Sequence, residues 1–336
     1  MGSEYRKELE NLERSTLSDL ALAASDSKGR ATPEPEDDLM TAFQRDRDRI
    51  VHSKAFRRLA HKTQVFLAPE GDHYRVRLTH TLEVTQVART IARALRLNED
   101  LVEAICLGHD LGHTPFGHLG EEVVARFQPG FRHNLQSVRI VDVLEGLNLT
   151  WEVRDGIANH TWSMPLPATL EGQIARYADR IAYINHDIDD AERAGVLREN
   201  DLPDETRTVL GATHAERVKT MVRDIVSSSR GQTEIRMSEQ IFSAMATTRT
   251  FLFERVYLGR LAPATREAVD RMLLTLLEHY AEHPDAIPAA AAGRGETVEV
   301  PQVRSVDYVA GMTDRFAIRA FEDLVGAPSP GFGGLG

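Results

Sequence analysis

The chain has almost no cysteine. Cys106 is the only cysteine among 336 residues, which excludes an internal disulfide. A chain with a single thiol is typical of a reducing compartment, so we expect a cytoplasmic protein. Because Cys106 stands between Ile105 and Leu107, we interpret it as a small buried residue of an apolar core.

Long apolar runs are also missing. No stretch of about 18 apolar residues occurs, so no transmembrane helix is expected. The first residues, MGSEYRKELENLERS, are charged and lack the apolar core of a signal peptide. Gly2 does not predict myristoylation, because position 6 is Arg6 rather than serine or threonine. We therefore expect no membrane partner.

Positive charge is in deficit. The chain carries 40 lysines and arginines against 51 aspartates and glutamates, a net charge of −11. Such a chain is a poor general binder of nucleic acid, so we expect nucleic-acid binding to be weak or absent. Arginines nevertheless crowd the region between Arg45 and Arg77, which favours a local basic pocket for an anionic substrate.

Composition and turn signals suggest how the chain is organised. Hydrophobic residues make up 42% of the chain, enough for a sizeable core. Residues 1–36, with prolines among acidic residues, predict a flexible arm or a surface wrap. We expect residues 37–195 to form a core. Residues 196–336 are expected to form a helical part that packs on this core and ends in a frayed tail. We expect an all-α fold with at most a small β-hairpin over 61–76.

Helical periodicity runs through most of the chain. Apolar residues recur at three and four positions over 77–97, and Asn98 is a good helix cap. The helix that Asn98 begins runs toward His109, and Gly112, Pro115 and Gly117 must break it. Four further helical segments are expected, over 134–145, 169–193, 214–227 and 234–282.

The segment LGHDLGHTPFGHLGEE, residues 107–122, concentrates metal-binding residue types. Six of its sixteen residues are histidines or carboxylates: His109, Asp110, His113, His118, Glu121 and Glu122. Imidazole and carboxylate are the usual ligands of a hydrolytic metal ion. Histidines that do not bind the ion can move protons near neutral pH. The segment therefore predicts metal-assisted hydrolysis.

Two other segments supply partners for this cluster. His80 follows Arg77 by three residues, which places both on one helix face. Asp179, Tyr183 and Asp187 recur at four-residue intervals and form a stripe on another helix. Such a stripe is usually just solvated, but apolar residues interleave with it here. Asp179 would complete a set of two histidines and two carboxylates.

With these residues in place, the chain resembles the HD-domain phosphohydrolases. The order His80, His109-Asp110, Asp179 matches their metal-binding pattern. The resemblance is to the deoxyguanosinetriphosphate triphosphohydrolase-like branch. Matching blocks are FRRLAHKTQVF at 56–66, HYRVRLTHTLEV at 73–84, GHDLGHTPFGHLGE at 108–121, FRHNLQS at 131–137, NHT at 159–161, YADRIAYINHDIDD at 177–190 and AGMTDRFA at 310–317. They cover about residues 40–195 and a C-terminal motif, and imply an all-α HD-domain fold with its catalytic core over 37–195.

The resemblance implies a metal-dependent hydrolysis of deoxynucleoside triphosphates. His80, His109, Asp110 and Asp179 are then the ligands of one ion. Two imidazoles and two carboxylates suit Mn, Mg, Co or Fe rather than a thiolate-rich zinc site. The implied products are deoxynucleoside and tripolyphosphate, formed by attack at the α-phosphorus.

Catalytic and substrate-binding roles follow from the same resemblance. His118, with Glu121 behind it, is implied to act on the reacting phosphate or the leaving 5′-oxygen. His113 and His133 are implied to lie near the phosphates. The implied substrate contacts are Arg77 and Arg180 to phosphate, Gln64 and Asp187 to the 3′-hydroxyl, and Tyr183 against the 2′ carbon. Three other histidines, His61, His186 and His214, are interpreted as core residues.

Several alternatives remain open at this stage. No segment specifies the base, so dGTP hydrolysis is one case among several. Arg304, Tyr308 and Asp314 in the C-terminal motif either line a neighbouring pocket or form a structural cap. The resemblance implies a homo-oligomer, a hexamer or smaller, and a second dNTP as an activator in some members. The rival functions are hydrolysis of a nucleoside monophosphate or cyclic nucleotide, and nucleotide sensing or single-stranded nucleic-acid binding with little turnover.

Overall fold

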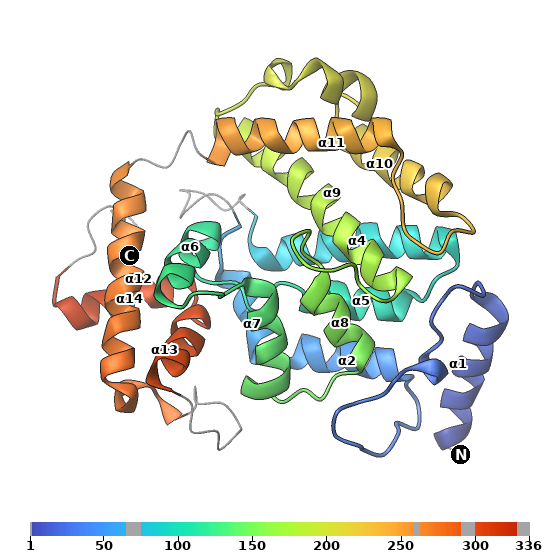
Figure 1. Ribbon diagram of the computed structural model, residues 1–336, viewed down its shortest axis with the longest axis horizontal. Helices are drawn as coiled ribbons and strands as arrows, with labels where there is room; N and C mark the ends of the chain where they lie inside the picture. Colours follow the sequence, from blue (N-terminus) through green and yellow to red (C-terminus); the bar gives the residue numbers. More distant parts are fainter. Residues whose placement is uncertain (1, 65–74, 258–262, 290–299, 328–336) are drawn as a thin grey trace. The chain divides into compact units, whose positions relative to one another are not determined.

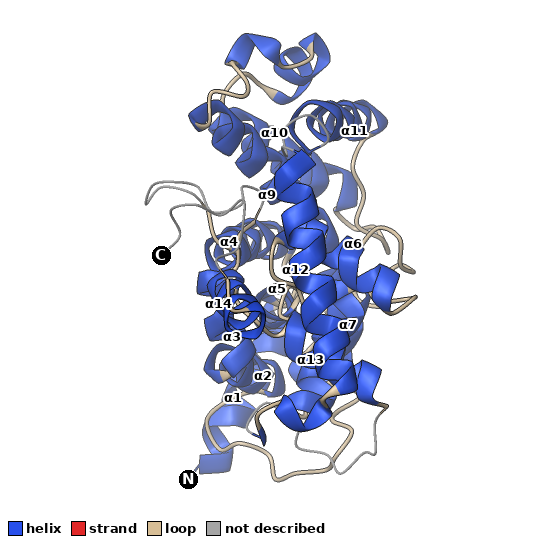
Figure 2. Ribbon diagram, turned by 90° about the vertical axis from the view of Figure 1, so that its left-hand side faces the viewer, coloured by secondary structure: helices blue, strands red, loops and turns tan. Residues whose placement is uncertain are grey.

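The computed structural model of the chain is helical. It describes residues 2–64, 75–257, 263–289 and 300–327. Within these ranges β pairing is limited to two isolated antiparallel bridges, Arg30–Thr150 and Thr63–Val76 (Figure 2). This confirms the all-α fold. The hairpin expected over 61–76 lies mostly outside the described residues, with the Thr63–Val76 bridge joining its two ends. No described helix is both long enough and apolar enough to cross a membrane.

The chain divides into two compact units, each built from three segments. The first unit comprises Met1–Val51, His80–His109 and Asn148–Gly259, and the second comprises His52–Thr79, Asp110–Leu147 and Arg260–Gly336. The motif segment 107–122 is therefore shared, because the division runs between His109 and Asp110. The expected boundaries between 1–36, 37–195 and 196–336 stay a prediction.

The first unit is centred on its longest helix. Its α-helices are α1 (Gly2–Thr16), α2 (Ala42–His52), α4 (Arg77–Leu95), α5 (Glu99–Gly108), α8 (Trp151–Asn159), α9 (Leu170–Arg193), α10 (His214–Ser229) and α11 (Glu239–Leu252). Short helical turns are η1 (Ala24–Asp26), η4 (Glu199–Asp201), η5 (Thr206–Leu210) and η6 (Phe253–Tyr257). Helix α9 packs against α5, α8, α10 and α11 (Figure 1). Its buried residues Ile174, Ile181 and Ile188 place one face of α9 in the core.

The helices around α9 begin and pack as their residues predict. Asn98 caps α5, because its side chain accepts hydrogen bonds from the backbone N–H groups of Asp100 and Leu101. A Cβ at Gly156 of α8 would lie 2.5 Å from Cδ1 of Ile105 on α5, so glycine permits this close approach. Cys106 of α5 is fully buried, which confirms the interpretation from sequence. Burial also raises the pKa of its thiol well above the usual value.

The N-terminal segment is fixed to the first unit by buried polar contacts. Glu171 of α9 accepts hydrogen bonds from the backbone N–H groups of Leu22 and Asn98, both at 3.1 Å. The carboxylate of Asp46 accepts from the backbone and hydroxyl of Thr150 and pairs with Arg30. The segment expected as an arm or wrap begins with helix α1, which was not predicted from the sequence.

The second unit packs around α12. Its helices are α3 (Lys54–Arg58), α6 (Gly117–Phe127), α7 (His133–Arg139), α12 (Pro263–Glu282), α13 (Pro301–Ala310) and α14 (Asp314–Val325), with the turns η2 (Leu59–His61), η3 (Ile140–Leu144) and η7 (Pro284–Ala286). Helix α12 contacts α6, α13 and α14 (Figure 1). The apolar core between them includes Val124, Leu273, Leu277, Val306 and Val309.

The predicted break in the motif segment is confirmed. Helix α5 ends at Gly108 and α6 begins at Gly117. A Cβ at Gly112 would lie 2.2 Å from the backbone nitrogen of Ser137, so only glycine allows the chain to pass there. Phe116 and Gly117 both have left-handed backbone conformations, with φ of 61° and 59°. This turn fixes the start of α6, the helix that carries His118 and Glu121.

Candidate active site

The predicted site residues belong to both units. In the first unit, three expected metal ligands converge from three elements. His80 comes from α4, His109 follows α5 directly, and Asp179 comes from α9. The Nε2 atoms of His80 and His109 lie 3.2 Å and 3.8 Å from the same Asp179 oxygen, Oδ1. Both imidazoles are almost completely buried.

The hydrogen bonds and charges of this group suit a cation. His109 Nδ1 donates to the backbone carbonyl of Cys106 at 2.6 Å, which orients the ring so that Nε2 is the atom facing Asp179. Burial would raise the pKa of Asp179, but a hydrogen bond from His80 and the charges of His109 and His160 hold it well below its usual range. An ionised carboxylate facing imidazole nitrogens is a donor set that fits a divalent metal ion.

The expected fourth ligand, Asp110, is the first residue of its segment in the second unit. Its Oδ2 accepts a hydrogen bond from Nη1 of Arg77 at 2.7 Å. Both side chains are buried, at 3% and 5% exposure. A buried guanidinium–carboxylate pair holds both groups in fixed positions, because breaking it would leave a charge unpaired. The two residues expected to bind metal and phosphate are therefore linked directly.

Three of the expected phosphate and sugar contacts lie along α9 in the first unit. The Arg180 guanidinium lies over the indole ring of Trp162, 3.8 Å from the ring centroid. Burial raises the pKa of Tyr183, so its hydroxyl stays protonated at neutral pH. Asp187 is buried at 1% exposure. The stripe that the sequence predicted is thus not a freely solvated helix face.

The second unit gathers the expected acid–base residues around one carboxylate. Glu121 of α6 accepts hydrogen bonds from the backbone nitrogen and the Nδ1 of His133, at 2.8 Å and 2.9 Å. Nδ1 of His118 lies 3.6 Å from the other Glu121 oxygen. The ring of His113 stacks on that of His133, with 4.6 Å between centroids. Glu121 therefore holds His133 more closely than His118, the partner expected from sequence.

Charges within this cluster separate the protonation states of its members. Burial would raise the pKa of Glu121, but His133 and His118 hold it well below its usual range. Burial would lower the pKa of His133, but the charge of Glu121 raises it. Burial, Arg77 and His133 together lower the pKa of His113 well below its usual value. His133 thus favours the protonated form and its stacked neighbour His113 the neutral form.

Comparison of the sequence with known proteins identifies the family of the chain. A model of the HD domain matches residues 77–184, and a model of the phosphohydrolase-associated domain matches residues 235–323. The chain is 53% identical to a "Deoxyguanosinetriphosphate triphosphohydrolase-like protein" of Caldanaerobacter subterraneus subsp. tengcongensis, over 97% of both chains. Proteins of the same name from Desulfatibacillum aliphaticivorans and Clostridium tetani are 48% and 43% identical, each over 95% of this chain and over 97% and 95% of their own length.

The chain belongs to the deoxyguanosinetriphosphate triphosphohydrolase-like family. It is an HD-domain phosphohydrolase, as its motifs predicted. The HD match begins at the first residue of α4 and ends within α9. It contains every residue assigned from sequence to the metal, and two of the assigned substrate residues, Gln64 and Asp187, lie outside it.

In this HD-domain phosphohydrolase, two further histidines lie beside the expected metal ligands, and neither was assigned to the site from the sequence. The ring of His160 packs edge-on against that of His109, with 5.0 Å between centroids. His186, interpreted from sequence as a core residue, is buried, and its Nδ1 lies 3.4 Å from Nδ1 of His80. The same interpretation is wrong for His61, which is exposed, and only half right for His214, which is half-buried beside Asp189.

The C-terminal motif supports the segment that carries Gln64. Asp314 accepts hydrogen bonds from the backbone nitrogens of Thr63 and Phe116, at 3.0 Å and 3.1 Å. Lys62 is buried, and its ammonium donates to the backbone carbonyls of His113 and Ala310. Burial and the charge of Arg58 lower its pKa to about 7. For Asp314, these contacts favour the structural cap over the pocket-lining alternative.

Proposed function

We propose that the chain hydrolyses deoxynucleoside triphosphates, dGTP among them, to deoxynucleoside and tripolyphosphate. The observation that carries the proposal is the convergence of the His80 and His109 Nε2 atoms on one oxygen of Asp179. The names of the relatives supply the substrate class. The motif order His80, His109-Asp110, Asp179 supplies the fourth ligand.

His80, His109, Asp110 and Asp179 would hold a divalent metal ion: Mn, Mg, Co or Fe. Such an ion, when bound, polarises a phosphoryl oxygen and lowers the pKa of water. The carboxylate of Asp179 is already ionised in the fold, since its neighbours keep its pKa low. Metal binding at neutral pH therefore need not release a proton from this ligand.

The remaining residues handle phosphate charge and the proton. Arg77 and Arg180 neutralise the phosphate oxygens, since guanidinium groups suit them. Water adds to the α-phosphorus, the bond to the 5′-oxygen breaks, and that oxygen takes a proton. His118, supported by Glu121, delivers this proton. His113 and His133 bind phosphate oxygens beside it.

Three residues select the sugar. Gln64 and Asp187 bind the 3′-hydroxyl, and the ring of Tyr183 lies against the 2′ carbon. A ribose 2′-hydroxyl would collide with that ring, so deoxyribose is chosen by exclusion of the alternative. The half-buried position of Tyr183 on α9 supports this role, because a packed ring cannot move aside easily.

Product analysis tests the proposal. The protein is incubated with each dNTP, singly and in pairs, with Mn²⁺ or Mg²⁺, and the products are identified by ³¹P NMR. We expect deoxynucleoside and tripolyphosphate, and the paired incubations show whether one dNTP activates hydrolysis of another. Inorganic phosphate from a monophosphate, without tripolyphosphate from any dNTP, would overturn the proposal. Salt-dependent oligonucleotide binding without turnover would overturn it in favour of a sensor.

A further inference from the structure

A second candidate binding site lies in a pocket of the second unit. The pocket has a volume of about 230 Å³ and is lined by residues of α3, η3, α13 and α14 and of the turns that follow η3 and α13. Ligand pockets for drug-sized molecules span about 300–1,000 Å³, so this one suits a single small ring compound. None of its lining residues is among those proposed to hold the metal or the substrate.

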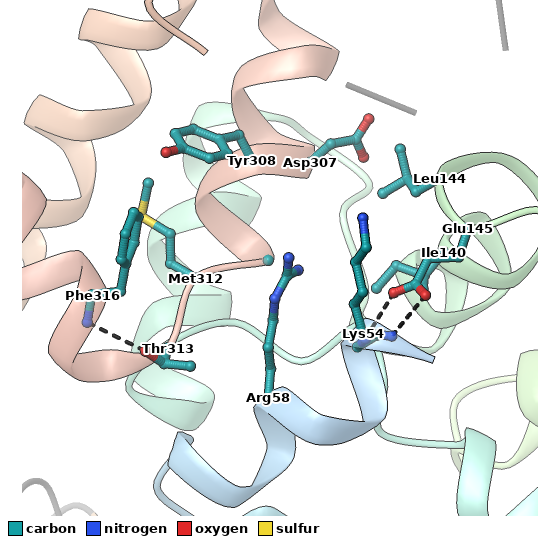
Figure 3. Close-up of a pocket in the computed structure, with 12 residues that line it drawn as sticks. Lys54, Arg58, Ile140, Leu144, Glu145, Asp307, Tyr308, Met312, Thr313 and Phe316 are labelled. Atoms are coloured by element: carbon teal, nitrogen blue, oxygen red, sulfur yellow. Dashed lines mark hydrogen bonds between the residues drawn. The ribbon is translucent and has the colours of Figure 1, made fainter. Parts of the chain in front are cut away.

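Two cationic side chains enter the pocket from one helix. Lys54 and Arg58 lie one turn apart on α3, and Figure 3 shows both cationic ends pointing into the space. Arg58 is half-buried, and its Nη1 would lie 3.2 Å from a Cβ at Gly311, so glycine leaves room for the guanidinium. Among the described residues, neither Lys54 nor Arg58 has a carboxylate partner.

The two carboxylates of the lining are engaged elsewhere. Glu145 accepts hydrogen bonds from the backbone nitrogens of Lys54 and Ala55, at 2.8 Å and 2.7 Å, and so caps α3 (Figure 3). Asp307 pairs with the guanidinium of Arg139, through two contacts of 2.7 Å. Neither carboxylate is thus bound to the side chain of Lys54 or Arg58, and these two cationic ends remain able to bind an anion with several acceptor oxygens.

The opposite wall is aromatic. The rings of Tyr308 and Phe316 lie 6.4 Å apart at 80°, and Met312 lies between their side chains in Figure 3. Phe316 keeps 42% of its surface exposed, which is high for a phenylalanine. Aromatic rings and a thioether pack well against another ring. This wall suits the flat part of a ligand.

We propose that this pocket binds an aryl or heteroaryl phosphate. The phosphate oxygens lie on Lys54 and Arg58, and the ring packs against Tyr308 and Phe316. The cations and the aromatic wall line the same small space, which suits one molecule that carries both a phosphate and a ring. This site does not rest on the proposed hydrolysis, since it uses none of the same residues.

Calorimetric titration of the full chain with phenylphosphonate tests the proposal, because a phosphonate resists hydrolysis. Inorganic phosphate and benzyl alcohol are the comparison ligands, since each carries one half of the chemistry. We expect phenylphosphonate to bind at least about tenfold more tightly than either. No detectable binding, or equal binding of inorganic phosphate, would overturn the proposal.

Substitutions of the pocket residues test whether phenylphosphonate binds in the pocket. Arg58→Ala and, separately, Lys54→Gln should weaken phenylphosphonate binding about tenfold, the loss of one charge-assisted contact. The matched control is Arg57→Ala, an exposed arginine of the same helix that donates to the carbonyl of His52. Lys54 is exposed, so its variant should fold even if the Arg58 variant does not. Unchanged binding in Lys54→Gln, or its loss in Asp179→Asn, would place the ligand elsewhere and overturn the assignment.

Discussion

The guanidinium of Arg180 stacks on the indole ring of Trp162, with 3.8 Å between its carbon and the ring centroid. Arg176, one turn earlier on α9, donates to the carbonyls of Thr161 and Met164 and so fixes the loop that carries the indole. The ring therefore acts as a platform for the arginine, because a cation over an indole face is held in place by the ring electrons.

Trp162→Ala should raise the KM for dNTP about tenfold, with a smaller effect on kcat. A cation–π contact of roughly 0.5–2 kcal/mol that orients Arg180 would be lost. Trp162→Phe keeps a ring under the guanidinium and should restore most of the affinity. Steady-state kinetics of both variants check this. An unchanged KM in the alanine variant would contradict a role for Arg180 in binding phosphate.

Asp179→Asn should weaken Mn²⁺ binding by at least about 100-fold, since even second-shell changes cost 10–100-fold. The amide keeps the shape of the side chain but loses the charge that faces His80 and His109. Electron paramagnetic resonance of free Mn²⁺ measures the affinity without any turnover. Asp189→Asn, the same change on the same helix, is the control and should bind Mn²⁺ normally. Equal affinity in the two variants would remove Asp179 from the ligand set.

Glu121→Gln should lower the pKa of His133. The negative charge that raises this pKa is lost, whereas burial, which lowers it, remains. The protonated fraction of His133 at neutral pH should fall. Heteronuclear NMR of the imidazole nitrogens, recorded from pH 5 to 9, follows the titration directly. A His133 titration that does not move would show that Glu121 is not its dominant partner.

Glu171→Gln should make the protein more stable at pH 8 while changing little at pH 5. Burial raises the pKa of Glu171 from 4.5 to about 7, so the folded state binds the extra proton between these values. The stability that this carboxyl contributes is complete below pH 4.5 and is lost as the pH rises through 7. Glutamine keeps an oxygen for the N–H groups of Leu22 and Asn98 but carries no charge. The gain over wild type at pH 8 should be about 2–3 kcal/mol.

Urea unfolding of both proteins at pH 5 and pH 8 measures this difference. Glu171→Ala is the control, because it removes the acceptor and should be destabilised at both pH values. A stability difference between wild type and Glu171→Gln that does not change with pH would contradict the buried-charge account.

Gly112→Ala should destabilise the chain by about 3 kcal/mol, the upper end for overpacking. The new methyl group would meet the backbone of α7, which cannot move aside as a side chain can. Gly130→Ala is the control: its φ of 90° strains alanine, but no atom lies within 4 Å of the added carbon. Thermal unfolding compares the two. A loss at position 112 no larger than that at position 130 would show that crowding is not the cause.

Much of the helical fold was predictable, because apolar residues recur at helical spacing within the sequence of each single helix. The expected segments 77–97 and 169–193 correspond to α4 and α9 within two residues. The segment 134–145 was predicted as one helix, but it divides into α7 and a π-helical turn at Ile140. Periodicity does not distinguish these, since the hydrogen-bond register depends on packing against the rest of the unit.

The site was less predictable, because its partners are distant in the chain. The resemblance supplied His80, His109 and Asp179, and the structure brings these three together. No local pattern links Trp162 to Arg180, or Lys62 to the carbonyl of Ala310. Such contacts arise only when helices pack, so a single sequence without its fold does not reveal them.

The burial of Cys106 makes the natural chain a ready background for site-specific labelling. Its thiol is inaccessible and resists ionisation, so it should not react with maleimides while the protein is folded. A cysteine introduced at an exposed position, such as Val325 on α14, would then be the one reactive thiol. A dye placed there reports on the neighbourhood of α14 without any prior removal of a native cysteine.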